Sequence, residues 1–148
     1  MGHFATGVTV VTTRDQHGRP FGLTANAVAS VSLQPPMVLV CVDQQAESHD
    51  AFAASRVFVV NILTQTQETL SRRFAKSCTD KFAGIGSREG VSGAPILEGV
   101  LAYLECRLLH AFEAGDHTIF VGEVVDLATG PEEEPLLFFR GGYRSTAT

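Results

Sequence analysis

The chain has 148 residues, of which 45% are hydrophobic and 18% are charged, and its net charge at pH 7 is −5. This composition excludes a disordered chain and is typical of one globular domain, which we expect to cover residues 1–148. The acidic balance and the scattered Lys and Arg residues argue against a nucleic-acid binder. There is no apolar run long enough to span a membrane and no signal peptide, so we expect a cytoplasmic protein.

Runs of apolar and β-branched residues predict most of the elements. A strand over residues 8–13 is followed by the turn-forming segment DQHGRP and by a return strand over residues 21–25, which together predict a hairpin. Continuous or alternating apolar runs predict further strands over residues 37–42, 57–63, 101–112, 117–127 and 136–139.

Two short helices are expected between these strands. The first begins at Ser48, and the second covers residues 66–76, with Thr64 and Gln67 placed as a capping box. Residues 78–99 are rich in Gly, Ser and Pro and predict a long loop.

Six or seven strands with long hairpins and only two helices predict a mainly β (α+β) fold. An antiparallel barrel with helices across its ends fits this pattern better than a doubly wound sheet. The usual dinucleotide site is thereby excluded. The GIGSREG segment at residues 84–90 has glycine spacing unlike the dinucleotide fingerprint and no preceding strand, so we interpret it as a flexible loop.

A series of small polar side chains leads into the strand at residues 37–42. Thr24, Asn26, Ser30 and Ser32 occupy even positions, with mostly apolar residues between them. Such side chains often bond to the backbone of their own turns. At the mouth of a barrel they would also suit a ligand with a polar edge and a flat apolar body. The residues alone leave both interpretations open.

The cysteines and histidines do not predict a metal site. Cys41 and Cys106 lie in apolar runs and Cys78 in a polar segment, and their odd number and spacing match no zinc framework. We expect reduced, structural thiols. No metal-ligand spacing relates the remaining histidines His3, His17 and His110.

Six segments, in order along the chain, resemble the flavin reductase-like family. They are FATGVTVVTT from residue 4, TAN from residue 24, SVSLQPPMVLVCV from residue 30, RRFA from residue 72, GDH from residue 115 and FFRGGYR from residue 138. Members are short NAD(P)H:flavin oxidoreductases that serve two-component flavin monooxygenases. The resemblance implies a split β-barrel of the FMN-binding type that binds FMN or FAD and oxidises NADH or NADPH. It also implies a homodimer and a separate flavin-dependent oxygenase as partner.

The resemblance assigns roles to particular residues. Those expected to line the flavin are Thr24, Ala25, Asn26, Ser30, Val31 and Ser32. Those expected near its ribityl and phosphate groups are Cys41, Val42, Ser48 and His49. A helix beginning at Ser48 would support a phosphate contact through its free N–H groups and dipole, although an ordinary N-cap followed by exposed residues is the alternative.

Three further residues are candidates for flavin contacts. Phe82 would pack on the flavin or on the core. Arg140 and Tyr143, in the closing segment, would contact the flavin, the dimer partner or a strand edge.

His117 is the candidate catalytic residue. The resemblance places it at the open face of the flavin, in contact with the nicotinamide nucleotide, and the alternative is a histidine that fixes its hairpin turn. No catalytic carboxylate is expected, because the two cofactors supply the reactivity.

Two other classes of protein remain open. One is a flavin-binding electron carrier or storage protein without nicotinamide turnover. The other is a pyridoxamine phosphate oxidase-like or haem-degrading protein with the same barrel fold. Such a protein would require a more basic phosphate pocket or a haem-ligating histidine, and neither is evident in the sequence. Family members also carry a helical stretch before the FATGVTVVTT segment, and contacts made by such a helix are not expected from this sequence.

Overall fold

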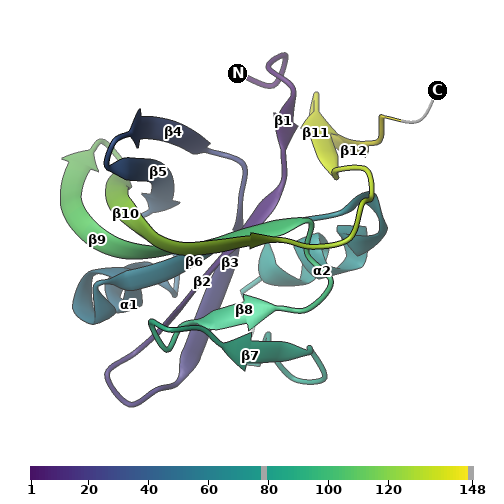
Figure 1. The fold of residues 1–148 in the computed structure, drawn as a ribbon. Helices are drawn as coiled ribbons and strands as arrows, with labels where there is room; N and C mark the ends of the chain where they lie inside the picture. The colour runs from purple at the N-terminus through teal and green to yellow at the C-terminus, as the bar shows by residue number, and fades with distance from the viewer. Residues whose placement is uncertain (78–79, 147–148) are drawn as a thin grey trace.

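Seven antiparallel strands form the main sheet of the computed structural model, which describes residues 1–77 and 80–146. Their order across the sheet is β3-β2-β6-β9-β10-β5-β4. The bounds are β2 Thr9–Arg14, β3 Pro20–Ala25, β4 Val28–Leu33, β5 Pro36–Asp43, β6 Val57–Ile62, β9 Ala102–Ala114 and β10 His117–Thr129. Figure 1 shows the long strands β9 and β10 curling around one side of the molecule, which gives the sheet the shape of a barrel. The expected fold class is confirmed.

Two small sheets flank the barrel. One joins the ends of the chain, with β1 (Thr6–Gly7), β11 (Leu137–Phe139) and β12 (Gly142–Arg144) in the order β1-β11-β12. The other is a hairpin of β7 (Ser87–Glu89) and β8 (Pro95–Leu97).

Both expected helices are present. Helix α1 covers His49–Ser55, and a 3-10 turn η1 (Gln65–Gln67) leads into α2 (Glu68–Phe74). The predicted capping box is confirmed, because the backbone N–H of Thr64 donates to the side chain of Gln67 at 3.0 Å. In Figure 1 the two helices lie well apart, toward opposite ends of β6. None of the helices in the described part of the chain has the length and apolar character needed to cross a bilayer.

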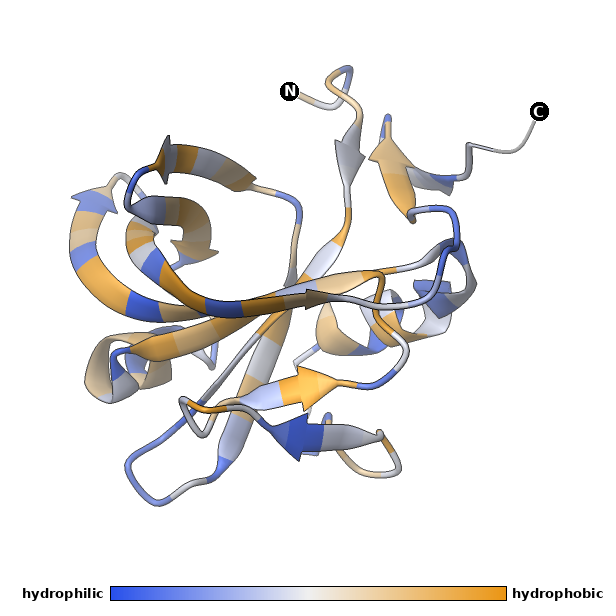
Figure 2. Ribbon diagram, in the orientation of Figure 1, coloured by the Kyte–Doolittle hydropathy of each residue, from blue (hydrophilic) through white to orange (hydrophobic). Residues whose placement is uncertain are grey.

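The core of the barrel is built around packed aromatic rings. Phe52 of α1 stacks on Phe120 of β10 with ring centroids 5.6 Å apart, and meets Phe58 of β6 edge-on at 6.1 Å. Gly122 allows this packing, because a Cβ atom there would lie 2.6 Å from the ring of Phe58. Figure 2 shows the apolar residues along β6, β9 and β10, whereas the turn between β2 and β3 is hydrophilic.

The barrel is split between β3 and β4. These strands form the two edges of the sheet, yet they are consecutive in the chain and only Asn26 and Ala27 separate them. The carbonyl oxygen of Ala27 accepts a hydrogen bond from the N–H of Cys41 at 3.0 Å, which ties this crossing to β5. The polar series of the sequence therefore lies where the barrel opens.

The loop expected over residues 78–99 is wrong in part, because it contains the β7–β8 hairpin and the end of GIGSREG forms β7. The three residues of β8 are buried, and the N–H of Leu97 donates to the side chain of Asn61 at 3.0 Å. A short buried run inside a Gly-rich segment gives too weak a periodicity to be predicted. The expectation for Cys78 lies outside the described residues.

Candidate functional site

A groove of about 350 Å³ opens at the split of the barrel. Asn26 and Cys41 line it, together with the apolar side chains of Val28 and Leu39. The rest of the wall comes from the N-terminal segment, the β3–β4 crossing and β4, through Met1, Phe4, Thr6, Ala27 and Ala29. An amide and backbone groups beside apolar walls suit a flat ring system with a polar edge.

Thr6 adds a polar atom to this wall that the sequence analysis did not single out. Its hydroxyl oxygen is buried and has no hydrogen-bond partner among the described residues. An unpaired buried hydroxyl costs free energy, so such groups are expected to find a partner in the functional state.

Two more hollows, of about 280 and 300 Å³, lie on either side of Ser48 and Lys81. Gly22 and Phe82 border the smaller one, and Thr24 borders the larger one. Thr24 and Asn26 are only two residues apart, so these hollows and the groove follow the same stretch of chain. The structure therefore brings together candidates from β3, α1 and the segment after α2.

The hydroxyl groups of Thr24 and Ser48 bond to the backbone of neighbouring elements. Thr24 donates to the carbonyl oxygen of Ser71 in α2 at 2.6 Å, and Ser48 donates to the carbonyl oxygen of Gly22 at 3.2 Å. Ser48 stands at the N-cap position of α1 but makes no capping bond with its side chain. These bonds fix the two side chains at the walls of the hollows.

His49, the first residue of α1, has both ring nitrogens engaged. Its Nε2 is 2.7 Å from the hydroxyl oxygen of Thr118, and its Nδ1 is 3.1 Å from the carboxylate of Asp50. Its backbone N–H donates to Ala46 at 3.0 Å and is not free for a phosphate. A phosphate contact by His49 would therefore require one of these bonds to be exchanged.

The remaining candidates of the polar series differ in exposure. Ser30, Val31 and Ser32 lie on the edge strand β4, where Val31 stands at an irregularity in the pairing with β5 and is 45% exposed. Ala25 and Val42 are buried in the core cluster. Their side chains therefore belong to the core of the barrel.

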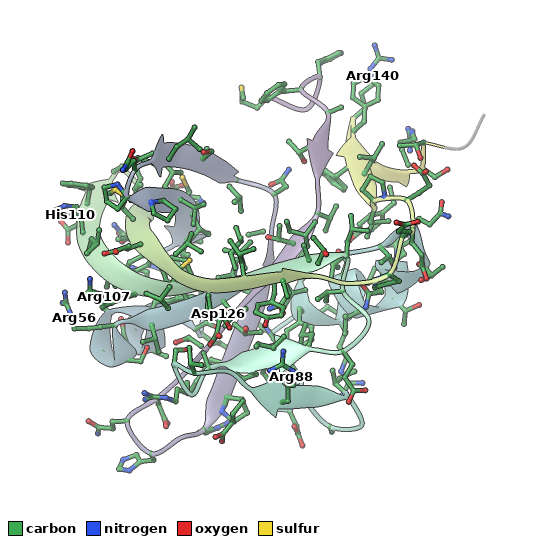
Figure 3. All side chains as sticks on the ribbon, viewed as in Figure 1. Arg56, Arg88, Arg107, His110, Asp126 and Arg140 are labelled. Atoms are coloured by element: carbon green, nitrogen blue, oxygen red, sulfur yellow. The ribbon has the colours of Figure 1, made fainter. Side chains whose placement is uncertain are left out.

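Phe82 and Tyr143 pack against α2. The ring of Phe82 meets Phe74 edge-on at 5.0 Å, and the hydroxyl group of Tyr143 lies 2.6 Å from that of Ser71. Arg140 is exposed and lies over the ring of Phe139 at 5.2 Å. Figure 3 shows it pointing away from the barrel, near the N-terminal segment, so this chain alone does not bring Arg140 to the hollows.

His117 begins β10 on the opposite side of the strand from Thr118, because neighbouring strand residues point to opposite faces. Its side chain is 41% exposed, and its Nδ1 is 2.7 Å from the carboxylate of Asp116. This hydrogen bond, together with the charge of His117, lowers the pKa of Asp116 below the ordinary 3.8. His117 lines neither the groove nor the two hollows.

Lys81 and Arg19 border the hollows although sequence reasoning did not select them. Lys81 immediately precedes Phe82, which the resemblance did select, so this neighbour was the one available signal. Among the described residues, no group of three or more His, Cys, Asp or Glu side chains is arranged to hold a metal. Burial raises the pKa of the Cys106 thiol to about 12, and the charge of Glu105 adds to the shift, so this thiol is a poor nucleophile.

The family model described as "Flavin reductase like domain" matches residues 1–147. The chain belongs to the flavin reductase family. The reductase subunit HsaB of a flavin-dependent monooxygenase from Rhodococcus jostii is 43% identical over 143 residues, which are 97% of this chain and 73% of that protein. An NADH-dependent FAD reductase from Streptomyces globisporus is 42% identical over 99% of this chain and 82% of its own length.

Solved structures of the family share the fold. The NADH:FAD oxidoreductase SgcE6 of Streptomyces globisporus, solved in complex with NAD and FAD fragments, superposes with a TM-score of 0.93 at 44% identity, covering 99% of this chain and 88% of that one. The flavin reductase PheA2 gives a TM-score of 0.90 at 42% identity, covering 100% of this chain and 94% of that one. The expected family, fold and enzyme class are confirmed, and the chain is an oxidoreductase of the flavin reductase type.

Relatives differ in how much of their length the chain spans. A flavin reductase-type relative from Rhizobium meliloti is 42% identical over 96% of this chain, but these residues make up only 45% of that protein.

Proposed function

We propose that this protein oxidises NADH or NADPH and reduces FMN or FAD, and that it supplies the reduced flavin to a separate flavin-dependent oxygenase. The observation that carries the proposal is the groove at the split of the barrel, where the Asn26 amide faces apolar walls. The names of the relatives support it, because HsaB is a monooxygenase reductase subunit and the Streptomyces protein is an NADH-dependent FAD reductase. The family model supports one domain over residues 1–148.

The residues present fit a flavin. In the groove, Asn26 offers an amide that both donates and accepts, and the buried hydroxyl of Thr6 lacks a partner among the described residues. The apolar side chains of Val28 and Leu39 would lie against a flat ring and keep water from it. Bound flavin and nicotinamide nucleotide supply the redox chemistry. The task of the protein is to orient the two rings and to place fixed donors beside the atoms that gain charge.

We assign the remaining candidates by their place along the same stretch. Ser30, Val31 and Ser32 would border the ring system from β4, and Ser48 would face the ribityl and phosphate end from α1. His117 would contact the nicotinamide nucleotide from the turn before β10. Since it lines neither the groove nor the two hollows beside Ser48, its approach would be from the open side of the site or from a partner subunit.

A homodimer is part of the proposal. Exposed apolar side chains lie on β10, where Val125 is 49% and Leu127 57% exposed, and on β9, where Phe112 is 53% exposed. Val125 lies at an irregularity in the pairing of β10 with β9, between Val124 and Asp126. A second copy would cover these apolar side chains, and light scattering at micromolar concentration that shows only a monomer would contradict this. We also place the protein in the cytoplasm.

The deciding experiment is a steady-state assay with the four pairs of NADH or NADPH with FMN or FAD. We expect oxidation of at least one nicotinamide nucleotide that depends on added flavin. Flavin binding without nicotinamide oxidation would indicate the alternative electron carrier. Absence of both would overturn the proposal.

Flavin titration of a double variant locates the site. Asn26→Leu with Ser32→Leu should weaken FMN and FAD binding strongly, because it removes polar groups from the proposed wall. Thr129→Leu, at an exposed position at the end of β10, is the matched control and should bind flavin like the unmodified protein.

A further inference from the structure

Among the described residues, the hydroxyl oxygen of Thr6 is the only buried side-chain oxygen or nitrogen without a hydrogen-bond partner. Buried polar atoms are nearly always paired, so an exception in a folded protein requires an explanation. Other buried threonines of this chain are paired. Thr9 donates to the carbonyl oxygen of Ala25 at 2.6 Å, and Thr13 donates to that of Val57 at 2.6 Å. Thr6 therefore differs from them in what its hydroxyl group contacts.

The backbone on both sides of Thr6 is held by the sheet that joins the two ends of the chain. Strand β1, which contains Thr6, pairs with β11. Before Thr6, the carbonyl oxygen of Gly2 accepts a hydrogen bond from the N–H of Arg140 at 2.8 Å. After Thr6, the N–H of Val8 donates to the carbonyl oxygen of Leu136 at 3.1 Å. These bonds fix the place of the Thr6 backbone beside the groove.

The turn of the C-terminal hairpin provides the first of these bonds. Only Arg140 and Gly141 separate β11 from β12, and both have a positive φ, of 51° and 72°. Two-residue turns of this kind match the twist of a hairpin, although a residue with a side chain loses free energy in this conformation. The FFRGGYR segment thus supports one wall of the groove, while none of its own side chains borders the groove.

The groove lies between this small sheet and the edge of the main sheet. Figure 1 shows β1, β11 and β12 as a unit apart from β4 and β5. The N-terminal segment contributes Met1, Phe4 and Thr6 to the groove, and of these only Thr6 has a polar side chain. The crossing from β3 to β4 contributes the Asn26 amide. A ligand in the groove would therefore meet a hydroxyl group from one sheet and an amide from the other.

The surroundings of Thr6 limit what its partner can be. The residue is half-buried, and rotation about χ1 exchanges its hydroxyl and methyl groups, so the hydroxyl can turn toward the groove. Because Val28 and Leu39 form apolar walls there, a suitable partner carries its polar group on a flat apolar body. The pyrimidine edge of a flavin ring has carbonyl oxygens and an N–H, and a hydroxyl group can donate to the former or accept from the latter.

We propose that Thr6 is a binding residue for the flavin ring, and that its hydroxyl group, unpaired in the flavin-free protein, bonds to the pyrimidine edge of the bound ring. The proposal rests on the proposed function, because it requires that the chain binds flavin in the groove. It also gives the FFRGGYR segment a role, since the C-terminal hairpin holds the strand that carries Thr6. A flavin bound in this way bridges the small sheet and the main sheet.

The first test is a fluorescence titration of the protein, as purified, with FMN, FAD and riboflavin. Thr6→Val replaces the hydroxyl by a methyl group of similar size. We expect the dissociation constants of all three flavins to rise by the same factor, about threefold to tenfold, because a hydrogen bond to their common ring is lost. Unchanged affinity, or a loss restricted to the phosphorylated flavins, would overturn the proposal.

Thermal unfolding provides a readout that moves in the opposite direction. Since the hydroxyl is unpaired without flavin, Thr6→Val should raise the unfolding midpoint of the flavin-free protein by about 2–4 °C. At one fixed FMN concentration, the ligand should then raise the midpoint less in the variant than in wild type, because the affinity is lower. A lower midpoint for the flavin-free variant would show that the hydroxyl is already paired in solution, by water or by a second copy of the chain, and the proposal would be wrong.

Three further variants keep the test decisive. Thr6→Ser retains the hydroxyl group, so its flavin affinity should stay within about twofold of wild type, and a loss as large as that of Thr6→Val would contradict the proposal. Thr6→Ala also lacks the hydroxyl and replaces Thr6→Val in the titration if the latter does not fold. Thr13→Val is the matched control, because it removes a paired threonine hydroxyl that borders neither the groove nor the two hollows beside Ser48. It should lower the unfolding midpoint and leave flavin affinity unchanged.

The carboxamide of a nicotinamide nucleotide offers similar hydrogen-bonding groups, and kinetics distinguish that source. At saturating flavin, the Michaelis constant for NADH should be the same for wild type and Thr6→Val. An increase in this constant with unchanged flavin affinity would assign the hydroxyl to the nicotinamide nucleotide and overturn the proposal. If the wild-type protein bound no flavin in the titration, the proposed function itself would fail, which is a distinct result.

Discussion

Polar side chains are buried in two regions of this molecule, and they are satisfied in different ways. Inside the barrel, Asn61 donates to the carbonyl oxygen of Val10 and to the hydroxyl of Thr12, and accepts from the N–H of Leu97, all at 3.0 Å. At the candidate site, Ser48 beside the hollows makes one bond to the backbone, and the hydroxyl of Thr6 in the groove makes none among the described residues. Fully paired groups hold strands together, and partly paired ones remain available to a ligand.

Glu105 is also a fully paired group inside the protein, although it carries an acidic side chain. It is completely buried and accepts hydrogen bonds from the backbone N–H groups of Val91 and Ser92, at 3.3 and 3.2 Å, and from the Ser92 hydroxyl at 2.9 Å. Gly90 lies so close that a Cβ atom there would overlap the carboxylate. A buried carboxylate of this kind fixes the turn between β7 and β8, so burial of a charged group does not by itself identify a functional site.

The largest effect on stability is expected when the same Asn→Leu substitution is made once in each region. Asn61→Leu should lower the free energy of unfolding by about 3 kcal/mol, because it removes three bonds and leaves buried backbone groups of Val10 and Leu97 unpaired. In a domain of this size the midpoint of thermal unfolding should fall by roughly 6–12 °C. Asn26→Leu, at an exposed position, should leave this midpoint nearly unchanged and weaken flavin binding. The reverse pattern would invalidate the distinction between the two regions.

The second effect concerns His117, which lies outside both regions. If it contacts the nicotinamide nucleotide, His117→Ala should lower kcat/KM for NADH or NADPH by about one to two orders of magnitude, the value of one hydrogen bond to a charged group. Flavin affinity should stay nearly intact. If His117 only fixes its turn, through the bond of its Nδ1 to the carboxylate of Asp116 at 2.7 Å, the variant should lose thermal stability and affect both cofactors in parallel. Steady-state kinetics and thermal unfolding separate these outcomes.

The difference between the regions also explains what could be predicted from the sequence. The apolar and β-branched runs that became β2, β5, β6, β9 and β10 contain enough residues for their periodicity to indicate a strand. The edge strand β4 alternates small polar and apolar residues, and β1 and β12 are too short for any pattern. Strand β1 also depends on a partner far along the chain, as in the pairing of Thr6 with Phe138.

The candidate site could likewise be predicted only in part from the sequence. Family resemblance selected Asn26, Ser48 and Phe82, which border the groove or the hollows. Arg73 donates to the carbonyl oxygen of Lys81, in a segment of chain whose course no local pattern indicates. Hydrogen bonds from a side chain to distant carbonyl groups leave no signal in hydropathy, so the contacts of these two residues could be identified only from the structure.

A smaller effect is expected at the boundary between core and site. The Tyr143 hydroxyl lies 2.6 Å from that of Ser71, and its ring meets Phe138 edge-on at 5.4 Å. Tyr143→Phe should lower the free energy of unfolding by about 1 kcal/mol, because one hydrogen bond is lost while the ring packing is retained. Chemical denaturation measures this loss. A decrease in flavin affinity at unchanged stability would instead assign the Tyr143 hydroxyl to the cofactor.

The smallest expected effect is the change in the pKa of Asp116 when His117 is removed. The hydrogen bond from His117, and then its charge, lower this pKa below 3.8, so His117→Ala should raise it toward the ordinary value. A carboxyl group whose pKa is depressed in the folded protein contributes stability above its unfolded pKa, and this contribution is lost as the pH falls through the folded pKa. The contribution is small here because Asp116 is exposed to solvent. The carboxyl carbon shift of Asp116, followed by NMR against pH in both proteins, measures the change. An identical titration in the two proteins would show that the histidine ring is not held by Asp116 in solution and is free to turn toward a bound nucleotide.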